Sequence, residues 1–306
     1  MEGNEMPRKR PPLRLVVNSM CNGNCVYCHH EGNESNEEMP ISTIRKCARI
    51  ANDLSLSDIS ITGGEPTLRD DLEEIIKIIN KEAPNTDVSI TTNGFNLALL
   101  NSIDVSIAKL NLSLSSLDKS IAQKYQNVDP EKALESFYNF NARCKNLNVV
   151  VTMDNYIEIP SIIKYCINES ISLDLMFELK KYTVDDIKIQ ENIFGFVETL
   201  GEASIELKNT PILAIKASND CTISIKHPFL TSLHDFAICR NCVSRISCFE
   251  KICAVRVLPN SCVSPCLNKK YVFNEGDLVE RISSAYQLAE KGTQSLSFIY
   301  NKYSYS

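Results

Sequence analysis

Residues 13–28 read LRLVVNSMCNGNCVYC, a strand-like run followed directly by three cysteines. The aliphatic run at 13–18 predicts a strand, and Cys21, Cys25 and Cys28 follow it with the spacing C-x3-C-x2-C. Thiolates are soft ligands suited to iron–sulfur clusters, and three ligands on a four-iron cluster leave one iron open. The spacing therefore predicts a catalytic cluster. The alternatives are a zinc knuckle or three cysteines with no common role.

The first 200 residues repeat a strand followed by a helix about six times. This alternation is typical of parallel βα units, in which the loops after the strands carry the active site. A complete eight-unit barrel needs about 250 residues, so we expect an α/β fold built as a partial (β/α)6 barrel with an open side. The predicted strands are 13–18, 58–62, 86–91, 109–114, 147–153 and 172–177, and the predicted helices are 41–55, 69–82, 130–144, 160–168 and 187–200.

The pattern changes near residue 200. Beyond it, seven of the 13 cysteines lie in short strand-like and loop segments. We therefore expect three parts: a loose basic tail at 1–11, a barrel core at 12–200 and a small cysteine-rich domain at 201–306.

Composition restricts the class of protein. The 306 residues are 43% hydrophobic and 23% charged, with 10 glycines and 12 prolines, which fits a folded globular chain. A net charge of −6 argues against a nucleic-acid duplex as partner, because duplex binding needs a basic face. The sequence has no apolar run of about 18 residues and no apolar export signal at its start. We therefore expect a cytoplasmic protein with no membrane partner and with reduced thiols.

Three further motifs stand at the ends of successive predicted strands. The second strand ends in TGGEP (62–66), the third leads into TTNG (91–94), and the fourth contains Ser113. Glycines let backbone groups approach a ligand closely, and the Glu65 carboxylate can accept charge-assisted bonds from an ammonium group. Gly23 is likewise expected to let the cysteine loop wrap a cluster without a clash. Each motif alone is equally typical of an ordinary turn, but together they predict one ligand site.

In this order the motifs resemble those of the radical S-adenosylmethionine (SAM) superfamily, over roughly residues 12–180. The resemblance implies that the three cysteines hold a [4Fe–4S] cluster whose open iron chelates SAM. One electron breaks the sulfonium bond, and a 5′-deoxyadenosyl radical takes a hydrogen atom from the substrate. An electron donor such as flavodoxin or ferredoxin is an implied partner. The residues implied in binding SAM are Tyr27, Gly63, Gly64, Glu65, Pro66, Thr92, Asn93 and Ser113.

The C-terminal cysteines contain a C-x2-C-x5-C run, which is typical of a metal centre. A structural zinc site is one interpretation, and a disulfide is a weaker one. Beside a radical SAM core the run resembles a twitch or SPASM-type domain. That resemblance implies an auxiliary [4Fe–4S] cluster, and the roles of Cys221, Cys253 and Cys262 stay open. The implied ligands are Cys239, Cys242, Cys248 and Cys266.

Longer stretches resemble the GTP 3′,8-cyclases of molybdenum-cofactor synthesis, from LRLVVNSMC through TGGEPTLRDDL to LSLSSLD. The resemblance implies catalytic roles for Arg14, Arg69 and Arg256, whose guanidinium groups suit phosphate oxygens. The chain departs from the cyclases at Ala254 and Ser115, in the spacing of its C-terminal cysteines and in lacking their double-glycine ending. Cyclase-like architecture is expected, whereas cyclase activity itself is not.

Three functions follow from these resemblances. The first is a cyclase-like radical SAM enzyme that acts on a small molecule, with a nucleotide as the leading case. The second is a peptide-modifying radical SAM enzyme, and the third a non-enzymatic metal-binding protein. Retention of the SAM motifs argues against the third.

The remaining candidates are weaker. His29 and His30 are expected to be a surface pair, and Glu178 to point toward the substrate. Three cysteines on predicted helices are expected to be buried: Cys47, Cys144 and Cys166.

Overall fold

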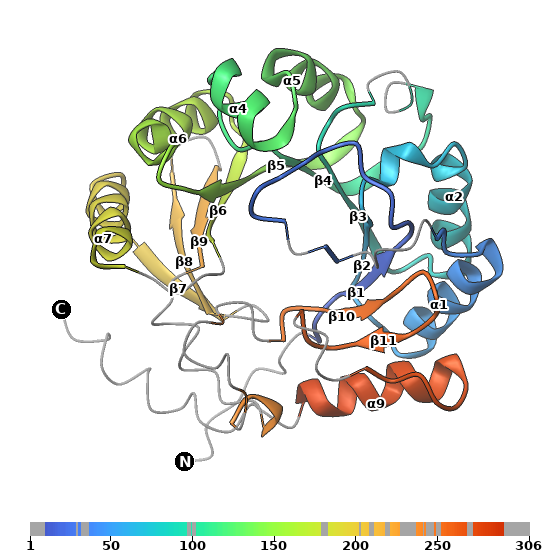
Figure 1. The fold of residues 1–306 in the computed structure, drawn as a ribbon. Coiled ribbons are helices and arrows are strands. Elements are labelled where there is room, and N and C mark those ends of the chain that lie inside the picture. The colour runs from blue at the N-terminus through green and yellow to red at the C-terminus, as the bar shows by residue number, and fades with distance from the viewer. Residues whose placement is uncertain are drawn as a thin grey trace.

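Six parallel strands from the first 180 residues form the centre of the fold, with helices on their outer side (Figure 1). Each strand pairs with the next one along the chain, as right-handed βα units require. The fold class predicted from the sequence, a partial (β/α)6 barrel, is thereby confirmed. The strands are β1 (Leu13–Val16), β2 (Asp58–Thr62), β3 (Asp87–Thr92), β4 (Ile107–Ser113), β5 (Ala142–Val151) and β6 (Ser172–Phe177).

The structure is a computed structural model. It describes residues 10–28, 30–31, 37–96, 99, 102–178, 183–201, 203–207, 211–217, 221–226, 237–240, 242, 248, 252–267 and 272–290.

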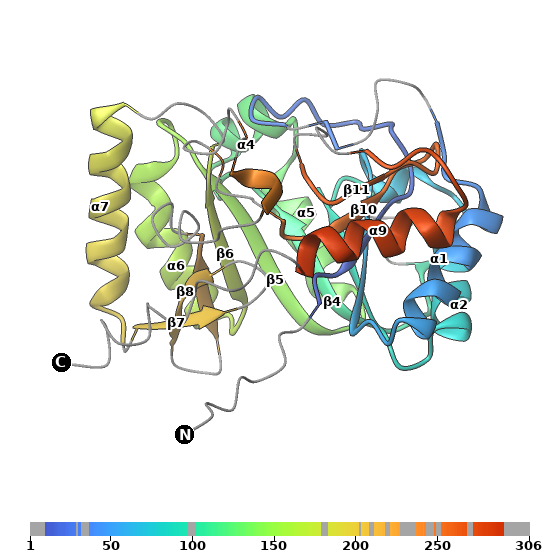
Figure 2. The same ribbon diagram turned by 90° about the horizontal axis from the view of Figure 1, so that it is seen from below.

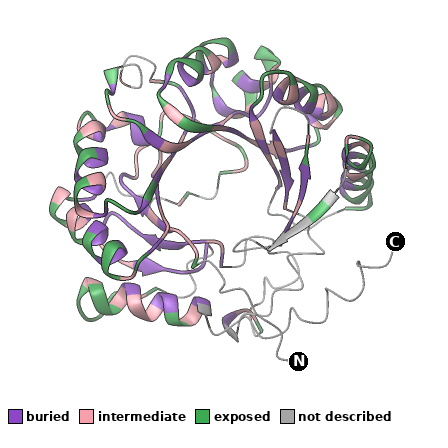
Figure 3. Cartoon of the chain, turned by 180° about the vertical axis from the view of Figure 1, so that it is seen from behind, coloured by how far each residue is buried: buried purple, intermediate pink, exposed green. Residues whose placement is uncertain are grey.

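The helices bury one apolar face against the strands and expose the other, as Figure 3 shows. In the second long helix, four aliphatic side chains at helical spacing (Leu72, Ile75, Ile76 and Ile79) are fully buried. The helices and short 3-10 turns are α1 (Ile41–Asp53), η1 (Pro66–Leu68), α2 (Leu72–Glu82), α4 (Lys119–Gln126), α5 (Pro130–Asn139), η2 (Tyr156–Glu158), α6 (Ile159–Asn168), α7 (Val184–Glu198), η4 (Ala237–Cys239) and α9 (Leu278–Glu290). Within the described ranges, no helix combines the length and apolar character needed to cross a bilayer.

One predicted helix is too long. The helix expected over 130–144 ends at Asn139, because Phe140 adopts an extended conformation and Ala142 already pairs with Ile107 of β4. Cys144 therefore lies on β5 and is exposed, so its prediction as a buried helical residue is wrong. The predictions for the other two helical cysteines, Cys47 and Cys166, are confirmed, since both are fully buried.

The residues beyond 200 extend the same sheet at both edges. Strands β10 (Val255–Val257) and β11 (Val263–Ser264) continue it from β1, while β9 (Thr222–Ile225), β8 (Pro211–Lys216) and β7 (Ala203–Leu207) continue it from β6. The result is one sheet of 11 strands. An edge strand has unpaired backbone groups, and these additions satisfy them on both sides of the six-stranded core. The boundary predicted at residue 200 thus marks the end of α7 and does not separate two sheets.

Alternate residues of the strands point to opposite sides of the sheet. On β4 the apolar Leu110 and Leu112 are buried toward the helices, while Asn111 and Ser113 belong to the opposite, inner face. On β1 the same alternation places Leu13 and Leu15 outward and Arg14 inward. The inner face of the barrel is therefore polar, which suits a ligand site at its mouth.

Candidate functional site

The loop after β1 carries the cysteine triplet across one end of the barrel (Figures 1 and 2). Cys21 and Cys28 are exposed and Cys25 is half-buried. Backbone N–H groups already donate to two of the sulfurs, from Gly23 to Cys21 Sγ and from His30 to Cys28 Sγ, each at 3.3 Å. Hydrogen bonds to sulfur are among the contacts that tune iron–sulfur clusters. These three thiols therefore fit a loop that holds an iron–sulfur cluster. His29, which follows Cys28, lies outside the described residues.

The thiols of this loop need a positive partner to ionise. Burial, together with the nearby Cys28 and Cys21, raises the pKa of Cys25 to about 11, and burial also raises the pKa of Cys21. A metal ion reverses this preference, because it binds the thiolate form. Among the described residues, no three His, Cys, Asp or Glu side chains lie close enough together to hold one metal ion.

The TGGEP segment is bound to the start of the cysteine loop. Gly64 N donates to Asn18 O at 2.8 Å, and Glu65 N donates to Met20 O at 2.7 Å. A Cβ on Gly64 would lie 2.1 Å from Met20 O, so glycine is required where these two backbones meet. The Gly64 and Glu65 N–H groups are thus used to bind the loop, and the predicted role of Gly63, Gly64 and Pro66 in binding SAM stays a prediction.

At Gly23 a Cβ would meet its nearest atom, Gln126 O, at an ordinary 3.4 Å. The protein atoms around Gly23 would therefore admit a Cβ, and the expectation that glycine avoids a clash with a cluster stays a prediction.

Glu65 joins the ends of β2 and β3. Its Oε1 accepts from Thr67 N, Thr67 Oγ1 and Thr92 Oγ1 at 3.1, 2.6 and 2.5 Å, and its Oε2 accepts from Asn93 N at 2.7 Å. Burial raises the pKa of this carboxylate, and the four hydrogen bonds oppose that rise. Glu65 therefore has a positioning role. A direct bond to the SAM ammonium stays a prediction, and it would use Oε2, which accepts fewer of these bonds.

The ends of β3 and β4 complete the support of the loop. Asn93 Nδ2 donates to Asn22 Oδ1 at 3.0 Å, so the TTNG turn reaches the residue next to Cys21. Gln126 accepts from Ser115 N at 2.5 Å and donates to Ser113 O at 3.2 Å. Sequence reasoning missed Gln126, because it lies at the end of α4, a helix that the apolar pattern did not predict.

Tyr27 and Asn18, which lie beside the cysteines, also contact the elements that hold the cysteine loop. Tyr27 stacks on Tyr125 of α4, with ring centroids 6.4 Å apart and an interplanar angle of 20°. Asn18, another residue that the sequence analysis missed, is fully buried and donates from Nδ2 to Glu65 O at 2.8 Å. In the sequence, only the position of Asn18 at the end of the predicted strand, before the first cysteine, indicated a role for it.

Two of the three predicted arginines lie side by side. Arg14 of β1 and Arg256 of β10 are register partners in the parallel pair of strands. Both donate to one oxygen, Glu31 Oε1, from Arg14 Nη1 at 2.8 Å and from Arg256 Nε at 3.1 Å. Burial by itself raises the pKa of Glu31, but the two guanidinium groups outweigh it and hold the pKa at about 2. The sequence analysis did not single out Glu31.

The third arginine has a different role. Arg69 is buried and donates from Nη1 to Val17 O at 2.8 Å and to Met39 O at 2.7 Å. Its Nε and Nη2 bind the Asp71 carboxylate. These bonds bring the two ends of the long loop between β1 and α1 together. The geometry supports a positioning role for Arg69, and the catalytic role implied by the resemblance stays a prediction.

Two of the C-terminal cysteines, Cys239 and Cys242, lie in one turn. Cys242 N donates to Cys239 O at 3.2 Å in a turn, and Cys239 packs on an apolar cluster that includes Ile252. Cys253 Sγ accepts from Arg256 Nη2 at 3.4 Å. The cysteine turn therefore lies near the segment that leads into β10. Cys248 and Cys266 are described as well, and their role as ligands stays a prediction.

Cys221 lies apart from both cysteine sets. It is buried at the start of β9, and its Sγ donates to Ile171 O at 2.8 Å. Ile171 precedes β6, so this contact is at the amino ends of parallel strands, opposite the cysteine loop. The role of Cys221, which the sequence left open, is therefore better explained by packing and this hydrogen bond than by cluster binding.

Replacing Cys221 with alanine is therefore expected to leave the iron content of the reconstituted protein unchanged. The variant loses a buried hydrogen bond, so its free energy of unfolding should fall by about 1 kcal/mol. Iron per chain and urea unfolding measure the two effects. Loss of iron would place Cys221 among the ligands.

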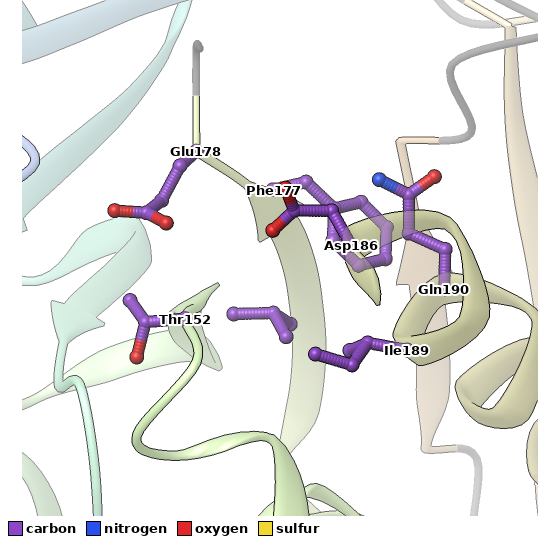
Figure 4. A pocket seen from close by; sticks show the side chains of 7 residues that line it. Thr152, Phe177, Glu178, Asp186, Ile189 and Gln190 are labelled. Atoms are coloured by element: carbon purple, nitrogen blue, oxygen red, sulfur yellow. The ribbon is translucent and has the colours of Figure 1, made fainter. Parts of the chain in front are cut away.

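A small recess, lined by both polar and apolar side chains, lies between the ends of β5 and β6 and the start of α7 (Figure 4). Gln190 lines it with a buried Nε2 that has no hydrogen-bond partner among the described residues. Glu178 directly follows β6 and lines the recess as well, and its predicted role toward the substrate stays a prediction. The recess is therefore a candidate part of the substrate site.

A family model described as the radical SAM superfamily matches residues 15–189. A probable GTP 3′,8-cyclase of Sulfurisphaera tokodaii is 30% identical over 195 residues, which are 61% of this chain and 60% of that protein. The probable GTP 3′,8-cyclase of Methanococcus aeolicus is 31% identical over 201 residues, 61% of this chain and 67% of that protein. The matched part thus spans 60% of the length of the first of these relatives.

Two solved structures share the fold. Streptococcus suis SuiB bound to S-adenosylmethionine superposes with a TM-score of 0.62 at 17% identity, covering 95% of this chain and 68% of that chain. The anSMEcpe structure with bound AdoMet gives a TM-score of 0.60 at 17% identity, covering 93% and 84%. At these identities the likeness concerns the fold alone.

Proposed function

This chain belongs to the radical SAM superfamily, and we propose that it cleaves SAM reductively and abstracts hydrogen from a small-molecule substrate in a cyclase-like reaction. The observation that carries this proposal is the arrangement of the cysteine loop. Three thiols follow β1 at the mouth of a polar barrel, and the ends of β2, β3 and β4 are hydrogen-bonded beneath them. A non-enzymatic metal-binding protein would not need three strand ends bonded to its cysteine loop in this way.

In the proposed site Cys21, Cys25 and Cys28 hold the cluster. When bound, the cluster supplies the electron with which SAM is split into methionine and a 5′-deoxyadenosyl radical. The ends of β2 to β4, with Glu65, Asn93 and Ser113, form the wall against which SAM is expected to lie. Tyr27, stacked on Tyr125, covers one side of the loop.

A small anionic substrate is supported by the arginine pair. Arg14 and Arg256 come from strands at opposite ends of the sequence and share one face of the barrel. Guanidinium groups suit carboxylate and phosphate oxygens. The relatives named probable GTP 3′,8-cyclases make a nucleotide the leading case. A peptide, such as the SuiA precursor in a complex of SuiB, is the alternative class of partner.

The test of this function is release of 5′-deoxyadenosine. The protein is reconstituted anaerobically with iron and sulfide and then mixed with SAM and dithionite. Release above the level of the untreated protein supports the proposal, and its absence contradicts it. Adding GTP tests the leading substrate. Faster release and a GTP-derived product support a nucleotide, whereas a response only to a short peptide supports the alternative.

We further propose an auxiliary [4Fe–4S] cluster held by Cys239, Cys242, Cys248 and Cys266. Replacing Cys239 and Cys242 with alanine is expected to lower iron by about four atoms per chain while leaving uncoupled SAM cleavage intact, since the first cluster has its own ligands. Iron analysis and 5′-deoxyadenosine release measure the two effects. Unchanged iron would favour zinc or no metal at this site, and metal analysis of the purified protein separates those outcomes.

A further inference from the structure

The Arg14–Glu31–Arg256 group is the most constrained charged cluster at the barrel mouth. Its members come from β1, from the end of the cysteine loop and from β10, and Glu31 and Arg256 are 225 residues apart in the chain. The side chain of Arg256 is 3% exposed, that of Glu31 15% and that of Arg14 28%. The cluster is therefore buried at Arg256 and open to solvent at Arg14.

The contacts leave part of the Arg14 guanidinium open to a ligand. Arg14 Nη1 binds Glu31 and its Nε is buried, but the side chain as a whole is 28% exposed. The exposed edge of the guanidinium is where an acceptor on a ligand would bind. Arg256 is held more firmly, since it also donates to Ala254 O and Cys253 Sγ.

The charges of the cluster determine what that acceptor can be. Two guanidinium groups with one carboxylate between them carry one net positive charge. Glu31 is ionised at neutral pH, because the two guanidinium groups hold its pKa far below 7. A multiply charged anion at Arg14 would gain from the two arginines but would also be repelled by the carboxylate that they share.

We propose that Glu31 sets the charge of the anion accepted at the Arg14–Arg256 pair, so that this site takes a substrate group with a single negative charge, such as a carboxylate or a phosphodiester, and discriminates against di- and polyphosphates. A nucleotide substrate, the leading case above, would then not place a triphosphate on this pair. The inference rests on the proposed function, since it concerns the substrate of that same site. Glu31 is thereby a specificity-determining residue that acts through the two arginines.

Two small anions test the charge rule without any assumption about the rest of the substrate. Acetate and pyrophosphate are added to the reconstituted protein at constant ionic strength, and their dissociation constants are obtained from the rise in unfolding midpoint. The variants are Glu31→Gln, which removes the charge, Glu31→Asp, which keeps it, and Glu38→Gln, an exposed glutamate that serves as the control.

Wild type, Glu31→Asp and Glu38→Gln are expected to bind pyrophosphate no more tightly than acetate. In Glu31→Gln the net charge rises by one, and pyrophosphate binding should strengthen about tenfold or more while acetate changes by less than about threefold. Adding Arg14→Gln to Glu31→Gln should abolish that gain. An unchanged ratio in Glu31→Gln, a gain that survives loss of Arg14, or a wild type that already binds pyrophosphate more tightly than acetate would overturn the proposal.

Two further measurements separate this inference from the proposed function. Substrate-free 5′-deoxyadenosine release and iron content report on the SAM site alone, so a failure there does not touch the anion result. The affinities for SAM and for acetate in Arg14→Gln show which molecule supplies the anion. If Arg14→Gln weakens SAM binding and acetate binding alike, the monoanion is the SAM carboxylate and the assignment to substrate is wrong.

Discussion

Replacing Cys21, Cys25 and Cys28 together with alanine is expected to reduce 5′-deoxyadenosine release from SAM to the level seen without protein. Iron should fall by about four atoms per chain, because one cluster loses all its protein ligands. The loop itself should stay in place, since bonds that do not involve sulfur hold it: Gly64 and Glu65 donate to its backbone, and Asn93 donates to the Asn22 side chain. Iron analysis and quantification of 5′-deoxyadenosine by chromatography measure the two losses.

Cys144 provides the matched control for this experiment. It is exposed on β5 and takes no part in either proposed cluster. Cys144→Ala should therefore keep both iron and SAM cleavage at wild-type values. Survival of iron and cleavage in the triple variant would contradict the assignment of the N-terminal cluster, and a loss in Cys144→Ala would show that the assay responds to thiol number rather than to the ligands.

Replacing Gly64 with alanine is expected to have the second-largest effect. The new Cβ would lie 2.1 Å from Met20 O and 2.7 Å from Ser19 O, and both are backbone atoms that cannot rotate away. The TGGEP segment and the start of the cysteine loop would have to separate. We expect a loss of at least about 3 kcal/mol in the free energy of unfolding, with reduced cluster incorporation. Urea unfolding and iron per chain measure these effects.

Gly195 is the control for the loss of a glycine. It lies inside α7, where an added Cβ would meet nothing within 4 Å. Gly195→Ala should raise the free energy of unfolding by about 0.5–1 kcal/mol, because alanine restricts the unfolded chain and favours a helix. If Gly64→Ala were as harmless as Gly195→Ala, the close approach of the two backbones would not exist as described.

Much of the barrel was predictable because its strands are short apolar runs between clear breakers. The strands at 58–62 and 172–177 were predicted to the residue. The errors came where local preference and tertiary pairing disagree. The polar helix α4 lacks a long apolar stripe, and its start is marked mainly by the Asp118 cap. The start of β5 is polar as well, and only its pairing with β4 makes it a strand.

The sequence by itself determined the family and the order of the site. The cysteine spacing, TGGEP, TTNG and Ser113 are local features, and parallel βα units bring successive strand ends to one edge without further information. Only the tertiary structure decided which contacts join these motifs to one another. The contact of Gly64 with Met20, the placement of Gln126 beneath the loop and the sharing of Glu31 by Arg14 and Arg256 each unite residues far apart in the chain. Such contacts depend on packing and strand register, which no local pattern of residues encodes.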